Sequence, residues 1–227
     1  MGFEVMAIGR LGVDLYPLQS GVGLEDVESF GKFLGGRAGN VAVATARHSH
    51  RVALISRTGD DAFGQYLVRE LERLGVDSRY VMSVPDLPTP ITFCEIHPPD
   101  HLPITFYRYP KAPDMEIHSN ELDFDEIGAA EILWITGSGL SQEPSRSAHH
   151  AAVEAKGVKG TIILDLGYRA DFWANPEEAR SHIERLLPHV NVVVGNQTEY
   201  RAPSERMTRG KAWSRRRVRT TWLGNGS

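Results

Sequence analysis

A glycine-rich turn that opens a helix is the stretch of this sequence best suited to bind a small polar molecule. Residues 35–40 read Gly-Gly-Arg-Ala-Gly-Asn, between a predicted strand and an alanine-rich helix over 40–49. Gly35 and Gly36 let the backbone approach a bound molecule because no Cβ stands in the way. The first helical turn offers free N–H groups, and the Asn40 side chain both donates and accepts hydrogen bonds. This mixture suits a sugar or another polyol, although a plain tight turn with Asn at the helix start fits the same residues.

Further polar side chains stand where predicted strands end. Asp14 follows a buried first strand, on the loop leaving it, where it suits either sugar hydroxyls or a turn. Asp165 ends a second strand, and Asn196 and Glu199 follow a third. In folds built on a parallel sheet, ligands bind beyond the carboxyl ends of the strands. We therefore expect these side chains to meet at one edge of the sheet.

Helices and strands alternate along most of the chain. Strands are predicted over 3–9, 27–34, 51–56, 76–83, 131–136, 161–166 and 190–194, and further helices over 62–74, 144–156 and 176–187. Residues 57–61 read as a polar turn in which Asp60 or Asp61 caps the next helix. Strands that alternate with helices of this length predict an α/β fold whose parallel sheet is covered on both faces.

A proline-rich break near residue 88 precedes two alternating stretches, over 91–96 and 104–109. Both carry aromatic residues, which suits a hairpin that forms a flap over a ligand. An ordinary edge hairpin fits the same pattern. Two pairs of histidines, 149–150 and 97 with 101, resemble metal pairs, but exposed helix and turn positions explain them better.

The composition favours a cytoplasmic protein. Hydrophobic residues make up 41% of the chain, charged residues 24%, and no run approaches the roughly 20 apolar residues of a membrane span. The N-terminus enters a strand without a secretory signal. The single cysteine, Cys94, has no internal disulfide partner, which suits a reducing compartment. We expect neither a membrane nor a nucleic acid as a partner.

The net charge of −4 is unevenly distributed. Residues 201–227 carry eight Lys or Arg and one acid, a net charge of +7, which leaves −11 for residues 1–200. The apolar periodicity also stops after residue 200. A basic tail could bind nucleic acid, but no stacking surface or recognition helix accompanies the charge. We expect residues 201–227 to be disordered or to be an out-of-frame translation, and the incomplete sheet to associate or dissolve poorly.

Five stretches, taken in order, resemble the ribokinase-like (PfkB) carbohydrate kinase family. They are Gly12-Val13-Asp14, Gly35-Gly36 with Asn40, residues 57–61 with Phe63-Gly64, Asp165 with Tyr168-Arg169 and Trp173, and Asn196 with Glu199. The resemblance covers about residues 3–200. Residues 12–17, 92–96, 106–114 and 137–146 are similar to family members that act on keto-deoxy sugar acids of the 5-dehydro-2-deoxygluconate type in inositol breakdown. A 2-keto-3-deoxygluconate kinase or a ribokinase stays open as an alternative.

The resemblance implies a three-layer αβα sandwich with a small β lid, formed by strands at about 27–34 and 91–109. It implies that the sugar hydroxyls are held by Asp14, Gly35, Gly36 and Asn40. Arg108 on the lid would reach the acidic or keto end, with Lys111 assisting, although Arg108 also suits a solvated strand position. The lid is where the resemblance would place self-association of the chain.

The resemblance also implies ATP and Mg²⁺ as cofactors. Asn196 and Glu199 match the family's Asn-x-x-Glu motif, which arranges Mg²⁺ and phosphate, the glutamate acting largely through water. Asp165 and Arg169 would lie on the nucleotide side, with Arg169 facing the phosphates. A simple strand-end turn at Asn196 and Glu199 is the alternative. Gly167 departs from the side chain, often acidic or amide, that related kinases carry there.

The family's Gly-Ala-Gly-Asp turn, whose aspartate takes the proton from the sugar hydroxyl, does not occur in these 227 residues. Its loss removes a base worth roughly 10²–10⁴ in rate and anion-stabilising donors worth roughly 10²–10³ each. If these effects added, the barrier would rise by about 5–9 kcal/mol. We therefore expect no catalytic residue in this chain and negligible kinase activity from it alone; a non-catalytic sugar-binding protein is the alternative.

Overall fold

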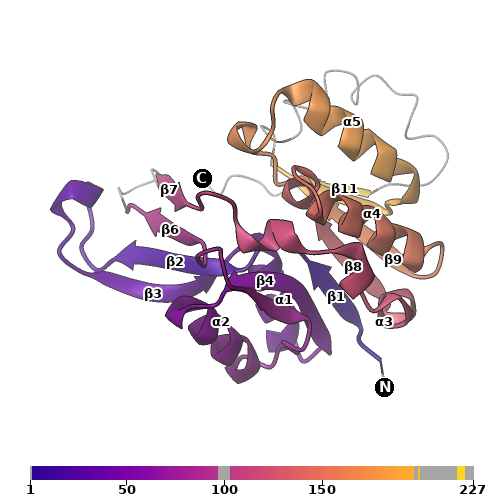
Figure 1. Cartoon of the computed structure of the whole chain (residues 1–227), viewed down its shortest axis with the longest axis horizontal. Coiled ribbons are helices and arrows are strands. Elements are labelled where there is room, and N and C mark those ends of the chain that lie inside the picture. Colours follow the sequence, from indigo (N-terminus) through magenta and orange to yellow (C-terminus); the bar gives the residue numbers. More distant parts are fainter. Residues whose placement is uncertain (1, 97–102, 197–198, 200–218, 223–227) are drawn as a thin grey trace.

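The centre of the molecule is a parallel seven-stranded sheet, seen in a computed structural model that describes residues 2–96, 103–196, 199 and 219–222 (Figure 1). The strand order is β11-β10-β9-β8-β1-β4-β5, and each neighbouring pair is parallel. The strands are β1 (Val5–Ile8), β4 (Val52–Gly59), β5 (Val81–Val84), β8 (Ile132–Thr136), β9 (Thr161–Asp165), β10 (Val192–Gly195) and β11 (Arg219–Trp222). The predicted parallel α/β fold is confirmed.

Alternating side chains of the central strands face two different helical layers. In β1, Val5 and Ala7 pack into one buried cluster, and Met6 and Ile8 pack into the other. The first cluster lies under two helices and the second under three: α1 (Arg37–Arg47) and α2 (Ala62–Arg73), then α3 (Phe124–Ala129), α4 (Ser145–Lys156) and α5 (Pro176–Leu186). Strands buried on both faces explain why their sequences read as continuous apolar runs.

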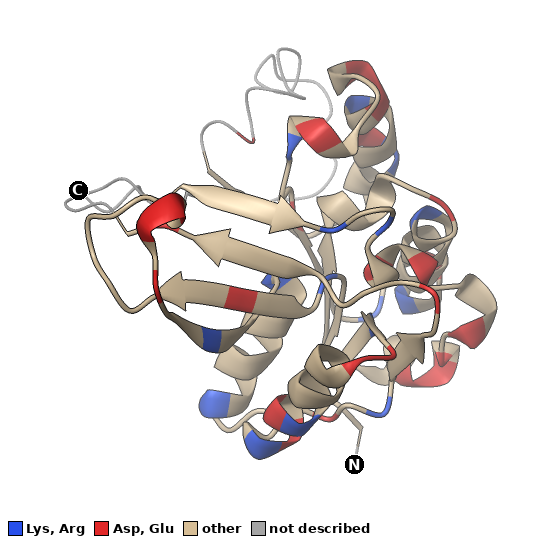
Figure 2. Ribbon diagram, turned by 60° about the vertical axis from the view of Figure 1, so that its left-hand side comes forward, with Lys and Arg blue, Asp and Glu red and all other residues tan. Residues whose placement is uncertain are grey.

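A second sheet of four strands, in the order β3-β2-β6-β7, extends away from the central sheet (Figure 1). Its strands are β2 (Gly12–Pro17), β3 (Phe30–Gly35), β6 (Ile91–Cys94) and β7 (Ile104–Tyr107). Figure 2 shows that the small sheet carries little charge, and its strands contain only two charged residues, Asp14 and Lys32. Strands β3, β6 and β7 lie at about the residues predicted for the lid, and β2 adds a fourth strand that was not predicted.

Three predictions about strands were wrong in their extent. Residues 12–17 form β2 and not a loop, because they pair with β3 on one side and β6 on the other. Asp14 therefore projects from a strand. Strand β4 continues to Gly59, so Arg57 and Thr58 are buried in the sheet and do not form a turn. The predicted strand over 76–83 is confined to Val81–Val84, where it pairs with the end of β4.

The start of α1 also differs from the prediction. The helix begins at Arg37, directly after Gly36, and the Asn40 N–H already donates to the Gly36 carbonyl oxygen at 2.8 Å. His149, expected at an exposed position, lies on the buried face of α4 and is fully buried. His97 and His101 lie outside the described residues. Most of the basic segment 201–227 does too, and its described part, Arg219–Trp222, forms β11 beside β10. No helix in the described part is long and apolar enough to cross a membrane.

Asp61 caps α2 and ties that helix to the segment that leads into β6. Its carboxylate accepts hydrogen bonds from the backbone N–H of Gly64 at 2.8 Å, the N–H of Thr89 at 2.8 Å and the Thr89 hydroxyl at 2.7 Å. Partial burial raises the pKa of Asp61, but these hydrogen bonds outweigh burial and leave it below 3.8. Of the two capping candidates in the sequence, Asp61 is the one that caps the helix.

Replacing Asp61 with alanine should lower the free energy of unfolding by about 1–2 kcal/mol near neutral pH. Because the folded pKa lies below the unfolded value, this contribution is complete above that value and is lost as the pH falls through the folded pKa. Urea unfolding at about pH 7 and about pH 3 measures the difference, which should shrink at low pH. Asp61→Asn keeps one acceptor and serves as the uncharged control. An equal loss at both pH values would contradict the assignment.

Candidate functional site

A cavity of about 260 Å³ lies between the carboxyl ends of the central strands and the small sheet. Asp14, Gly36, Asn40 and Arg169, all predicted from the sequence, line it. Residues that follow β1, β8 and β9 close one side, and β2, β6 and β7 supply the other. We call it the Asp14 cavity. Of the strand-end side chains expected to meet at one edge of the sheet, Asp14 lines this cavity, whereas Asp165, Asn196 and Glu199 do not line it.

Both positions directly before α1 require glycine, because neighbouring atoms lie too close to the backbone for a Cβ to fit. A Cβ on Gly35 would lie against the Asp14 carboxyl group, closer than atoms can approach. Gly36 has φ of 91°, and a Cβ there would lie 2.5 Å from the carbonyl oxygen of Arg10. The turn therefore packs β3 against the end of β1 and the middle of β2, and it fixes where Asp14 stands.

Asp14 is a partly buried carboxylate that projects from strand β2 of the small sheet. Burial raises its pKa, and a hydrogen bond with Thr92 on the neighbouring strand partly offsets this rise. Tyr16, two residues along the same face of β2, has its pKa raised to about 12 by burial and by Cys94. At neutral pH this wall of the cavity offers a carboxylate acceptor beside a phenol that keeps its proton. Such a pair can receive and donate hydrogen bonds to hydroxyl groups.

A compact ion cluster lies on the central-sheet side of the same cavity. Arg37 donates through Nη1 to Asp165 Oδ1 at 2.6 Å and through Nη2 to Glu199 Oε1. Arg169 Nη1 lies 3.7 Å from that same Glu199 oxygen. Asn196 and Glu199 bond reciprocally: the Asn196 N–H donates to Glu199 Oε2 at 3.1 Å, and the Glu199 N–H donates to Asn196 Oδ1 at 2.9 Å. Burial and the nearby Glu199 raise the pKa of Asp165, and Arg37 opposes them.

Arg108 and Lys111 do not line the Asp14 cavity. They line an adjoining cavity of about 310 Å³, called here the Arg108 cavity, and Phe172 lines both. The Arg108 guanidinium lies over the Phe172 ring, 3.7 Å from its centroid. Lys111 is held by Glu116 at 2.5 Å and by the Glu143 carbonyl oxygen at 2.8 Å. The structure thus brings Arg108 beside the site and holds Lys111 on partners of its own.

Two guanidinium groups lie near the Phe172 ring, and each has a buried nitrogen atom without a hydrogen-bond partner among the described residues. Arg10 lies 5.0 Å from the ring centroid, and its Nε is 3.4 Å from Asp114. Arg10 Nη2 and Arg108 Nη1 are buried and have no hydrogen-bond partner among the described residues. Burial, reinforced by the nearby Arg10, lowers the pKa of Arg108 to about 10. Two mutually repelling cations with free donors indicate a site for an anionic group.

Sequence reasoning missed three residues that shape this site. Arg10 follows the glycine that ends β1, Arg37 stands inside the glycine-rich turn itself, and Phe172 precedes Trp173 after β9. The glycine-rich turn draws attention to Arg37, but its two acidic partners lie 128 and 162 positions away, so the sequence does not indicate the ion pairs. Nothing in the sequence signals that Phe172 separates two cavities.

The family model for "pfkB family carbohydrate kinase" matches residues 3–209. The chain belongs to this family. Among curated relatives, the 5-dehydro-2-deoxygluconokinase of Lacticaseibacillus casei is 32% identical over 200 residues, covering 87% of this chain and 61% of the relative. That of Clostridium tetani (strain Massachusetts / E88) is 32% identical over 226 residues, covering 99% of this chain and 66% of the relative. The chain thus spans about three fifths to two thirds of the length of these kinases.

Solved structures agree with the family assignment. An uncharacterized sugar kinase from Pyrococcus horikoshii, determined in complex with ATP, matches with a TM-score of 0.78 and 27% identity over 89% of this chain and 66% of that one. The predicted ribokinase-like sandwich and the resemblance drawn from five short stretches are therefore confirmed. ATP use is what this kinase family implies for the pfkB chain described here.

The ion cluster contains two carboxylates, a type of ligand that Mg²⁺ takes in proteins. Mg²⁺ in kinases is bound by one or two carboxylates together with water and phosphate oxygens. Asp165 and Glu199 supply two buried carboxylates, and the guanidinium between them already stands where positive charge is stabilised. In the described part of the chain, no group of three His, Cys, Asp or Glu is arranged to hold a metal. The donor set therefore fits Mg²⁺ that keeps much of its water.

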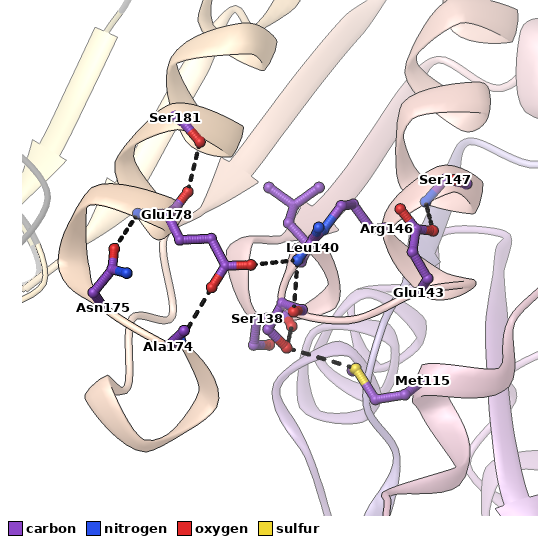
Figure 3. Close-up of polar contacts among 11 residues, drawn as sticks. Met115, Ser138, Leu140, Glu143, Arg146, Ser147, Ala174, Asn175, Glu178 and Ser181 are labelled. Carbon is purple, nitrogen blue, oxygen red and sulfur yellow. Dashed lines mark hydrogen bonds and ion pairs between the residues drawn. The ribbon is translucent and has the colours of Figure 1, made fainter.

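Arg146 on α4 holds the loop after β8 that brings Ser138 to the Asp14 cavity (Figure 3). Its guanidinium donates to the carbonyl oxygens of Leu140 at 2.7 Å and Ser141 at 2.8 Å. It also pairs with Glu178 of α5 at 2.9 Å. The Ser141 hydroxyl turns back to the Ser138 carbonyl oxygen at 2.8 Å. One arginine therefore fixes the loop against α4 and α5 together.

Replacing Arg146 with alanine should destabilise the fold by about 2 kcal/mol, because two carbonyl oxygens lose a charged donor. Amide hydrogen exchange should rise most over residues 137–141. Arg73→Ala, on an exposed face of α2, is the matched control and should leave both urea unfolding and exchange unchanged. Unchanged protection of the loop in Arg146→Ala would refute this role.

Proposed function

We propose that this pfkB kinase transfers a phosphoryl group from ATP to a hydroxyl of a keto-deoxy sugar acid of the 5-dehydro-2-deoxygluconate type. The observation that carries the proposal is the pair of buried guanidinium groups, Arg10 and Arg108, with unpaired nitrogens beside the Asp14 cavity. A neutral sugar offers these cations only uncharged oxygen acceptors, whereas a carboxylate gives both of them stronger, charge-assisted hydrogen bonds. The names of the curated relatives at 32% identity support the same substrate.

The Asp14 cavity supplies the complementary half of this recognition. Asp14 accepts hydrogen bonds from hydroxyl groups, and its place in β2 is fixed by the glycine turn. Asn40 and the backbone of Gly36 line the same wall and add donors and acceptors. A substrate with a charged end and a hydroxylated chain then meets Arg10 and mixed polar groups in the Asp14 cavity, and Arg108 in the adjoining cavity. Lys111 serves in this proposal to hold Glu116 and the neighbouring loop.

Asp165, Asn196 and Glu199 are the residues that would hold Mg²⁺, and the bound ion would neutralise phosphate charge. Asn196 keeps the Glu199 carboxylate oriented through their reciprocal hydrogen bonds. Arg169, whose guanidinium is about two fifths exposed and lines the cavity, is placed to bind nucleotide phosphates. The roles of Asn196, Glu199 and Arg169 follow the resemblance, which placed Asp165 on the nucleotide side; Asp165 is added as a metal ligand because it shares Arg37 with Glu199.

These 227 residues contain no Gly-Ala-Gly-Asp turn to supply a general base. We infer that a polypeptide of this sequence, tested by itself, binds the sugar acid without turning over ATP, because the loss of a base alone costs roughly 10²–10⁴ in rate. Titration calorimetry and an ATP turnover assay separate this from its alternatives. Turnover would overthrow the inference. Binding of ribose in preference to the sugar acid would favour a ribokinase, and absence of any sugar binding would contradict the proposal as a whole.

Replacing Arg108 with methionine should weaken binding of the keto-deoxy sugar acid by at least about tenfold, since a buried charge partner is lost. The methionine keeps apolar contact with Phe172, so folding should be preserved. Binding of a neutral sugar of the same chain length should be unchanged. Arg79→Met, at an exposed ion pair with Asp77, is the control for removing a positive charge. Calorimetry that shows equal losses for the acid and the neutral sugar would exclude Arg108 as the carboxylate ligand.

A further inference from the structure

Arg37 stands between two carboxylates that are held much more firmly than it is. The side chains of Asp165 and Glu199 are only 10% and 2% exposed, whereas that of Arg37 is 37% exposed. Each acid is also fixed from behind by a backbone donor. The Gly167 N–H donates to Asp165 Oδ1 at 3.1 Å, and the Asn196 N–H donates to Glu199 Oε2 at 3.1 Å. The carboxylates of Asp165 and Glu199, called here the cradle, are therefore held in place. The Arg37 side chain is more exposed and can change its position more easily.

The charges in this cluster balance without any added ion. Two carboxylates face two guanidinium groups, because Arg169 approaches Glu199 from a second direction. A divalent cation that enters the cradle meets oxygens already shared with Arg37 and is repelled by two nearby positive charges. Removing one of those charges should therefore make the cradle a better cation site. Arg37 donates hydrogen bonds to Asp165 Oδ1 and Glu199 Oε1, so a metal ion would compete with Arg37 for these two oxygens.

We propose that Arg37 is a place-holding cation that competes with a divalent metal ion for the carboxylates of Asp165 and Glu199. Arg37 is a positioning residue in this scheme: it keeps the two acids together in the metal-free protein and lowers their affinity for a free ion. It also opens α1 directly after Gly36 and lines the Asp14 cavity. Arg37 therefore links the carboxylates of the cradle to the glycine turn that holds Asp14. A role of this competition in phosphoryl transfer rests on the proposed function. The competition itself does not depend on that function.

The scheme makes free metal binding the decisive measurement. Electron paramagnetic resonance of Mn²⁺ titrated into the 227-residue chain, without sugar or nucleotide, reports bound and free ion directly. Arg37→Gln should bind Mn²⁺ about tenfold more tightly than the unchanged chain, the scale expected from removing one charge in a partly exposed site. Arg37→Lys, which keeps the charge but loses the two-point contact, should show a smaller gain. Arg73→Gln on α2 is the matched control and should show none.

A double variant distinguishes the cradle from any other Mn²⁺ site. In Arg37→Gln combined with Asp165→Asn, the gain should disappear, because one of the two carboxylates is gone. A gain that survives this change would overturn the proposal, as would an Arg37→Gln chain that binds Mn²⁺ no more tightly. Thermal unfolding shows whether each variant is folded, and Arg37→Lys decides the question if Arg37→Gln is not. Because sugar and ATP are absent, failure here is distinct from failure of the proposed substrate, which the Arg108→Met titration tests.

Discussion

The site depends on a steric constraint: the backbone at Gly35 and Gly36 packs where no side chain fits. Gly35 lies against the carboxyl group of Asp14, and Gly36 lies against the carbonyl of Arg10 with φ of 91°. A residue with a Cβ at such a backbone conformation costs about 1–3 kcal/mol before any clash is counted. This contact joins the small sheet to the central sheet at one point. It sets the direction of α1 and the position of the carboxylate that faces the cavity.

Charged groups of different kinds lie in different places around this contact. One side of the Asp14 cavity has a carboxylate whose pKa is raised by burial, and the other has acids already neutralised by Arg37 and Arg169. Two guanidinium groups with free donors lie near Phe172: Arg10 lines the Asp14 cavity, and Arg108 lines the adjoining one. Buried charge is costly unless it is paired, and here the pairing is incomplete: Arg10 pairs with Asp114, but Arg10 Nη2 and Arg108 Nη1 have no hydrogen-bond partner among the described residues. The ion cluster, in contrast, balances two carboxylates with two guanidinium groups.

The sequence was sufficient for the fold because its central strands are buried on both faces and its helices are amphipathic. Those two patterns are local and can be read without knowing the partners. The extent of β2 and β4 could not be read in this way. Asp14 interrupts the apolar pattern of β2, and pairing with β3 and β6 overrides that interruption. Arg57 looks like a turn residue, but its guanidinium finds the carbonyl oxygens of Ser56 and Tyr80 and the carboxylate of Glu121 inside the structure.

The topology explains why several of the predicted polar residues lie near one another, but the sequence does not show how they pair. Asn40 follows the glycine turn and Arg169 follows β9, so both reach the edge of the sheet, where Asp14 reaches the same cavity from within β2. The pairing of Arg37 with Asp165 joins residues 128 positions apart, so no local pattern reports it. His149 was misplaced for a related reason. Its helix is amphipathic, but the buried face is decided by which strands it covers, and His149 Nδ1 lies 2.8 Å from the Ser145 carbonyl oxygen within that face.

The two adjoining cavities are best understood through Phe172, which lines both. Each cavity is near or below the roughly 300 Å³ at which small-molecule pockets begin, so neither alone accounts for an extended substrate. An aromatic ring shared between them gives an apolar divider whose face attracts cations. Arg108 lies over that ring, and Arg10 approaches it while bound to Asp114. Phe172 thus holds both guanidinium groups at the boundary between the two cavities, and the nearby Asp114 carboxylate offsets part of their mutual repulsion.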